Sequence, residues 1–170
     1  YSKIKHGFRR DIAVEDEVTA VMEYENGATG VFVTCTHDLL GTDRLEILGD
    51  KGKIVVEDSK TVTVKRLKES ENDLNKNMDM EDVKRLFMGQ LNTDDLYSTE
   101  TFTEESAWGS QHSGVLENFA RHVLYGEDLL APGEEGINGV RLANAIHLST
   151  WTGEEISLTD FDDDLYLREL

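Results

Sequence analysis

The sequence predicts an α+β fold, in which a large open, mainly antiparallel sheet carries helices packed on one face. Three observations predict it. Strand-like segments joined by short turns dominate the first part of the chain, and helix-like segments gather after residue 110. No low-complexity linker separates them. A single domain over residues 1–170 is the simplest organisation for this length.

The composition excludes several classes of partner. The formal net charge of −18 repels nucleic acid and anionic lipid, so we expect neither as a partner. No apolar run approaches the ~20 residues that span a membrane, and no signal peptide is visible. Cys35 is the only cysteine, which rules out a disulfide framework within the chain and favours a cytoplasmic location.

Residues 15–37 predict a β-hairpin. Apolar and polar residues alternate from Val18, and Asn26-Gly27 predicts a type I′ turn, in which both central residues have positive φ. The return strand is apolar on both sides of Phe32, so we expect both of its faces to be at least partly covered.

Further strands are predicted at 44–48, 53–57 and 61–67, with a tight turn at 49–52. Short connections of this kind predict an antiparallel meander. Residues 1–13 form a connecting segment or a first strand. Charged side chains such as Glu46 and Lys53 mark a sheet face that meets water or a partner. Four β-branched residues on exposed strand surfaces favour sheet-to-sheet association: Thr19, Val21, Val31 and Val33.

Residues 68–105 form an irregular, polar excursion from the sheet. Val83, Leu86 and Phe87 fit either one helical turn or the centre of an inserted strand, and the sequence leaves both open. A further strand is expected at 98–105.

Two helices are predicted after the excursion. The first carries one apolar stripe and ends near Gly126, and the second follows Pro132-Gly133 and is expected to be well buried against the sheet. The stripe consists of Val115, Leu116, Phe119 and Val123. We expect a last strand at 154–158 and then a solvated acidic tail to Leu170.

Most motifs that carry chemistry are missing. No G-x-G-x-x-G sequence occurs, so we expect no dinucleotide site in this chain. The acidic segment from Asp160 does not fit a calcium loop because Leu165 stands where glycine is needed. The histidines lack zinc-site spacing and no nucleophile elbow occurs, so no catalytic residue and no metal ligand is assigned.

His112 is the candidate binding residue, because it stands at a predicted helix start beside Trp108 and Gln111. Helix N-termini with nearby polar groups are common ligand-binding positions. Spacing alone favours a capping or structural role for His112.

Three segments together resemble a known family. Residues 15–37, 41–58 and 111–158 are similar to the C-terminal domain of the glucose–fructose oxidoreductase, inositol dehydrogenase and rhizopine catabolism (Gfo/Idh/MocA) family. The resemblance rests on several weak motifs in the right order, and 68–105 is its weakest stretch. Thr159 departs from the family, which usually has proline after the last strand.

The resemblance implies an NAD(P)-dependent oxidoreductase acting on a sugar, cyclitol or related polyol. Family members join an N-terminal Rossmann domain to a second domain that shapes the substrate pocket and forms homo-oligomer contacts through its sheet. Their catalytic lysine lies in an E-K-P motif that this sequence lacks, so no catalytic residue carries over. Trp108, Gln111 and His112 match the place where the second domain approaches the substrate.

Two hypotheses follow. In the first, the chain is the substrate-binding and oligomerisation domain of such an enzyme and is inactive alone; NAD or NADP binds the Rossmann domain of the intact protein. Because the first residue is Tyr1, we expect the chain to be part of a longer protein. In the second, the chain is a non-catalytic interaction module that assembles through its open sheet.

Overall fold

The computed structural model describes residues 1–7, 11–41, 43–105 and 109–170. The strands are β1 (Ser2–His6), β2 (Glu15–Glu23), β3 (Thr29–Cys35), β4 (Arg44–Gly49), β5 (Gly52–Glu57), β6 (Thr61–Leu67) and β7 (Tyr97–Thr103). The helices are α1 (Glu71–Asn77), α2 (Met80–Phe87), α3 (Ser110–Tyr125), α4 (Gly136–Thr152) and α5 (Asp163–Glu169), with short 3-10 turns η1 (Thr93–Asp95) and η2 (Gly133–Glu135).

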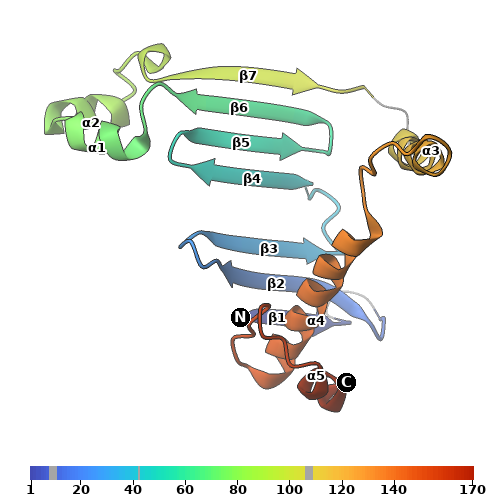
Figure 1. Cartoon of the computed structure of the whole chain (residues 1–170). Coiled ribbons are helices and arrows are strands. Elements are labelled where there is room, and N and C mark those ends of the chain that lie inside the picture. The colour runs from blue at the N-terminus through green and yellow to red at the C-terminus, as the bar shows by residue number, and fades with distance from the viewer. Residues whose placement is uncertain (8–10, 42, 106–108) are drawn as a thin grey trace. The chain divides into compact units, whose positions relative to one another are not determined.

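The strands form two sheets, in the orders β1-β2-β3 and β4-β5-β6-β7 (Figure 1). Every paired strand in the described residues is antiparallel, which confirms the predicted α+β class. The chain divides into two compact units, one of residues 1–40 and 114–170 and the other of residues 41–113. No helix in the described ranges is both long and apolar enough to cross a membrane.

In the first unit, α4 packs against β1. Three hydrogen bonds join the two elements: the Ser2 backbone N–H donates to Ser149 Oγ (3.1 Å), the Ser2 hydroxyl donates to the Ile146 carbonyl (2.5 Å), and it also bonds the Thr150 hydroxyl (2.9 Å). The buried apolar residues come from β1, β2 and the C-terminal half of α4: Ile4, Ala20, Ala145 and Leu148. These contacts make one face of the three-stranded sheet the core of the unit.

The N-terminal half of α4 departs from the prediction of a well-buried helix. Ile137 and Val140 are about half exposed, whereas Leu148 is 1% exposed. The apolar residues of α4 are spread around the helix, and only those that face β1 and β2 can be covered by this sheet.

The hairpin of β2 and β3 is confirmed, but its turn is not type I′. Only Gly27 has positive φ (83°), and Asn26 does not. The Tyr24 N–H donates to the Ala28 carbonyl and the Gly27 N–H donates to the Tyr24 carbonyl, so three residues form the loop. Three-residue hairpin loops place a left-handed residue last, and Gly27 fills that position.

The expectation that both faces of the return strand β3 are at least partly covered is wrong for the face that carries Val31 and Val33. Val31 is 70% exposed, Val33 is 63% exposed and Phe32 is 43% exposed. The register pairs Val33 with Thr19 and Val31 with Val21, which confirms that the four predicted β-branched residues share one exposed face. We call this surface, made of Thr19, Val21, Val31 and Val33, the valine face.

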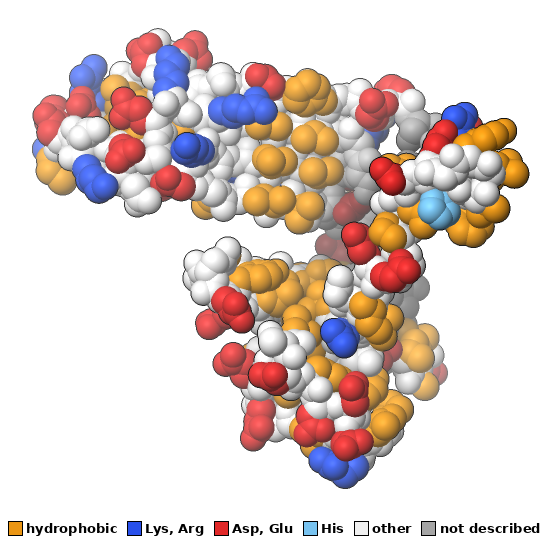
Figure 2. All heavy atoms as spheres, in the orientation of Figure 1, with side chains coloured by type: hydrophobic (Ala, Val, Ile, Leu, Met, Phe, Trp, Pro, Cys, Tyr) orange, Lys and Arg blue, Asp and Glu red, His pale blue; other side chains and the backbone are white. Residues whose placement is uncertain are grey.

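The second unit is the predicted meander. Between β5 and β6, Asp58 and Ser59 both have positive φ (54° and 49°), as a type I′ turn requires, so the type I′ turn lies here and not at Asn26-Gly27. The register places most of the apolar side chains on one face, which also carries the Arg66–Glu100 ion pair, and most of the charged ones on the other. The apolar face consists of Leu45, Ile47, Ile54, Val56, Val62, Val64 and Phe102, and Figure 2 shows hydrophobic side chains gathered across these strands.

The turn between β4 and β5 depends on Gly52. Its φ is 141°, and a Cβ atom there would lie 2.0 Å from the Lys65 carbonyl oxygen on the neighbouring strand. Gly49, at the other end of the same turn, has room, since the nearest heavy atom would lie 4.0 Å away. Gly52 therefore permits the close approach of β5 to β6.

The excursion after β6 is more regular than predicted. Val83, Leu86 and Phe87 lie in α2, so the helical alternative holds. Side-chain caps fix both helices: Ser70 accepts from the Asp73 N–H at the start of α1, and Asp79 accepts from two N–H groups at the start of α2. Strand β7 confirms the strand expected at 98–105.

The C-terminal segment differs from the prediction in two ways. Residues 154–158 form no strand, because no neighbouring strand pairs with them among the described residues and the left-handed Gly153 (φ 72°) precedes them. The acidic tail is not wholly solvated. It forms α5, capped by Asp162, and its Tyr166 stacks on Trp151 of α4 at a centroid distance of 5.6 Å.

Candidate functional site

The structure places two of the three predicted binding residues together. Gln111 and His112 both lie in the first turn of α3 and are exposed. The preceding Gly109 has a positive φ of 83°, and its carbonyl accepts from the Ser113 N–H (3.2 Å), which closes the first helical turn. Trp108, the third predicted residue, lies outside the described residues. The start of a helix, with polar side chains exposed beside it, is a common position for contacts to oxygen-bearing ligands.

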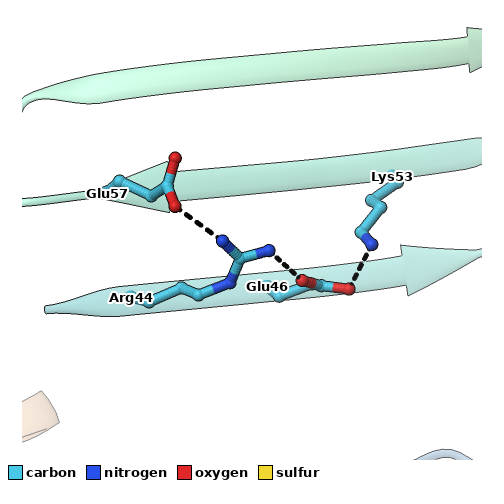
Figure 3. Close-up of polar contacts among 4 residues, drawn as sticks. All are labelled: Arg44, Glu46, Lys53 and Glu57. Carbon is cyan, nitrogen blue, oxygen red and sulfur yellow. Dashed lines mark hydrogen bonds and ion pairs between the residues drawn. The ribbon is translucent and has the colours of Figure 1, made fainter. Parts of the chain in front are cut away.

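The polar face of the second unit carries a chain of ion pairs (Figure 3). Arg44 donates to Glu57 (2.6 Å) and to Glu46 (2.5 Å), and the Lys53 ammonium lies 2.5 Å from Glu46. Lys53 and then Arg44 lower the pKa of Glu46, and Glu46 in turn raises the pKa of Arg44. The predicted charged sheet face is thus confirmed at Glu46 and Lys53, and its charges are largely balanced internally.

The first unit has a second polar cluster, which the sequence reasoning missed. Glu17 on β2 bonds Lys5 of β1, which lowers the pKa of Glu17, and it also bonds His37 Nε2 (3.1 Å). Two residues before it, Glu15 lies 3.5 Å from His147 of α4 and 3.8 Å from His6 of β1.

The missed cluster had a signal in the sequence. Glu15 and Glu17 alternate on β2, and antiparallel pairing places His6 and Lys5 directly opposite them. Once 1–13 is assigned as a strand, these pairs follow from the register, but the approach of His147 from α4 requires the tertiary packing. The cluster brings polar side chains of β1, β2 and α4 within contact distance of one another.

The described residues do not form a metal site or a dinucleotide site. No group of three histidine, cysteine or acidic side chains is placed to hold a metal ion among them. A dinucleotide site needs a strand that leads through a glycine-rich loop into a helix. The glycines at the start of α4 follow Pro132 and η2, with no strand leading into them.

Comparison with known proteins identifies the architecture. No curated protein sequence matches the chain. A family model described as "Oxidoreductase family, C-terminal alpha/beta domain" matches residues 2–158, which include β1 to β7 and α1 to α4. The chain therefore belongs to the Gfo/Idh/MocA oxidoreductase family and corresponds to its C-terminal α/β domain.

Proposed function

We propose that the chain is the substrate-binding and self-association domain of an NAD(P)-dependent oxidoreductase acting on a sugar, cyclitol or related polyol. The observation that carries this proposal is the family match over residues 2–158. The exposed sheet surfaces and the exposed Gln111 and His112 support it, because a domain of this kind needs a surface for its partners and a surface for its substrate.

In this proposal the redox chemistry belongs to a Rossmann domain that binds NAD or NADP. The sequence contains neither a G-x-G-x-x-G motif nor an E-K-P motif, and the described residues form no dinucleotide site. The 170-residue chain alone is therefore expected to catalyse no hydride transfer.

The proposed substrate contacts are Gln111, His112 and Trp108. Amide and imidazole groups donate and accept hydrogen bonds, which suits the hydroxyl groups of a polyol. An indole ring presents an apolar surface and one N–H donor. The exposure of Gln111 and His112 supports a role in contacting a ligand.

The proposed self-association surface is the valine face. Its side chains are β-branched, exposed and adjacent in the register, and a second sheet would remove them from water. A stable interface usually buries about 800 Å² on each partner, so neighbouring residues of the same sheet face would have to contribute as well. This surface is the specific observation that favours the second candidate function, a module that assembles without catalysis.

The decisive experiment uses the chain joined to its nucleotide-binding domain. Sugars and cyclitols are assayed as a panel with NAD and with NADP, and the expected result is turnover of at least one polyol. His112→Ala should raise KM for that substrate several-fold, because one hydrogen bond to substrate is lost. His122→Ala is the matched control, since His122 is exposed on the same helix ten positions later.

Three results would contradict the enzyme proposal. Turnover by the 170-residue chain alone would place the chemistry within it. Equal effects of His112→Ala and His122→Ala would remove His112 from the site. If the joined protein self-associates but oxidises no polyol with either cofactor, the assembly module becomes the better description.

A further inference from the structure

One cavity lies wholly within the second unit. It has a volume of about 330 Å³ and is lined by residues of β4 to β7, α1 and α2. Figure 1 shows α1 and α2 beside one end of the four-stranded sheet. Its walls include Leu67 and Tyr97 from the strands, Leu74 from α1, Met78 just after α1, and Leu86 from α2. Small-molecule sites in proteins range from about 300 to 1,000 Å³, so the cavity suits a compact ligand.

The apolar side chains that line the cavity remain partly exposed to solvent. Leu86 is 40% exposed and Leu48, another wall residue, is 70% exposed, whereas a tightly packed core would bury both. The Glu71 N–H donates to the Asp50 carbonyl (2.7 Å) and the Asn72 N–H donates to the Asp50 carboxylate (3.1 Å), which joins the start of α1 to the turn between β4 and β5. The wall is therefore a preformed hollow with accessible apolar carbon, which favours a ligand with an apolar body.

Two lysines give the cavity a cationic edge. Lys53 and Lys65 both line it and stand directly opposite each other on β5 and β6. Lys53 is neutralised by Glu46 at 2.5 Å. Lys65 lies 5.5 Å from the centre of the Tyr97 ring and forms no ion pair with any described acidic residue. An anion beside Lys65 would give this ammonium group the partner that Glu46 gives to Lys53.

The remaining polar wall residues are Glu71 and Asn75 of α1. Glu71 lies in the first turn of α1, where the helix dipole stabilises its own negative charge. Asn75 can donate a hydrogen bond to a ligand oxygen. Lys65 is thus the cation at the cavity that lacks an acidic partner in the described part of the chain.

We propose that this cavity binds a small amphipathic anion, with its apolar body against the leucines and its carboxylate or similar monoanionic head on Lys65. The site is separate from the first turn of α3 and does not depend on the proposed oxidoreductase activity. The chain carries a net charge of −18, so binding of an anion here requires the local positive charge of Lys65.

The test titrates the 170-residue chain with octanoate and with its neutral counterpart 1-octanol by calorimetry. Saturable binding of octanoate at one site per chain is expected, tighter than that of octanol. Lys65→Met keeps the apolar stem and removes the charge, so it should weaken octanoate about tenfold and leave octanol unchanged. Lys60→Met is the matched control, because Lys60 precedes the same strand and pairs with Glu105 away from the cavity.

A second variant tests the apolar wall. Leu48→Ala trims an exposed side chain, so the fold should survive, and both octanoate and octanol should bind more weakly. The proposal is overturned if octanoate shows no saturable binding, if Lys60→Met weakens it as much as Lys65→Met, or if Leu48→Ala changes neither ligand. Equal binding of octanoate and octanol to the unmodified chain would remove the anionic part of the proposal.

Discussion

The two sheets show the same alternation of apolar and polar side chains but differ in what covers them. The three-stranded sheet of β1 to β3 has one face under α4, and every buried residue of the described chain belongs to that unit. The four-stranded sheet of β4 to β7 has an apolar face of seven side chains, yet no described residue of its unit is buried. The regular structure of this unit therefore depends on its turns, its helix caps and its strand pairing, and not on a buried core.

This difference shows that the alternation of apolar and polar residues predicts which side chains share a face of a strand. It does not predict whether another element packs on that face. An apolar face becomes a core only when another element reaches it. In the first unit that element is α4, tied to β1 by the hydrogen bonds around Ser2. In the second unit α1 and α2 cover only the end of the sheet where the cavity lies. Stability should therefore depend on single side chains in the first unit far more than in the second.

The largest expected effect is at the centre of the first unit. Leu148→Ala should lower the free energy of unfolding by about 2–5 kcal/mol, because Leu148 is fully buried and its loss leaves a cavity. Leu45→Ala in the second unit is the control and should cost less than about 1 kcal/mol, since Leu45 is mostly exposed. Chemical denaturation followed by circular dichroism measures both, and equal costs would contradict the contrast between the sheets.

The next effect concerns the bond between β1 and α4. Ser149→Ala removes the acceptor of the buried Ser2 N–H, and the unpaired donor should cost about 1–3 kcal/mol of unfolding free energy. Ser157→Ala removes an acceptor of the Asp160 N–H in an exposed turn, where water can replace it. The same denaturation experiment compares them, and a larger loss for Ser157→Ala would disprove the argument.

Self-association distinguishes the two exposed faces. Val31→Lys should weaken dimer formation about tenfold or more, because it places a charge in the valine face. Ile47→Lys places the same charge on the apolar face of the second unit and should leave the dimer intact. Sedimentation over a range of concentrations gives the result. If the unmodified chain is monomeric, the proposed interface does not exist. If only Ile47→Lys loses the dimer, the interface lies on the apolar face of the second unit instead.

The smallest effect is a pH dependence shared by both sheets. Glu17 and Glu46 have pKa values lowered by Lys5 and by Lys53 respectively. A lowered folded-state pKa stabilises the protein above the ordinary glutamate value of about 4.3, and this contribution is lost as the pH falls through the lowered pKa.

Glutamine substitutions test this dependence. Glu17→Gln and Glu46→Gln should each flatten the acid limb of stability against pH, and high salt should flatten it further because both groups are partly exposed. Denaturation midpoints, measured at several pH values from neutral to acid, give the loss of stability as the pH falls. Glu23→Gln, an exposed carboxylate on the same β2 strand, serves as a control. An unchanged acid limb in both test variants would exclude these carboxylates as its source.

Local sequence signals predicted most of the fold. Alternation located β2 to β6, and Gly126 and Pro132 marked the boundaries of α3 and α4. The signals failed where tertiary contacts decide. Residues 154–158 alternate well enough for a strand, but no strand among the described residues pairs with them. The acidic tail forms α5, whose Tyr166 stacks on Trp151.

The sequence predicted the family and the candidate binding residues, but not the cavity in the second unit. A resemblance in sequence order identified the family, which the family model confirms. It also pointed to Gln111 and His112, whose shared exposed turn the structure now describes. The cavity and the lysine pair could not be predicted, because whether α1 and α2 face the sheet depends on packing that no local pattern encodes.

The turn between β4 and β5 has a consequence for which sequences can share this fold. Gly49 and Gly52 flank the same two residues, yet only Gly52 faces a backbone oxygen that no side chain can displace cheaply. A library randomised at both positions should keep alanine and serine at Gly49 but almost only glycine at Gly52. Sequence change in this hairpin is thus restricted at Gly52 by a single backbone oxygen atom, whereas Gly49, three positions earlier, can be replaced.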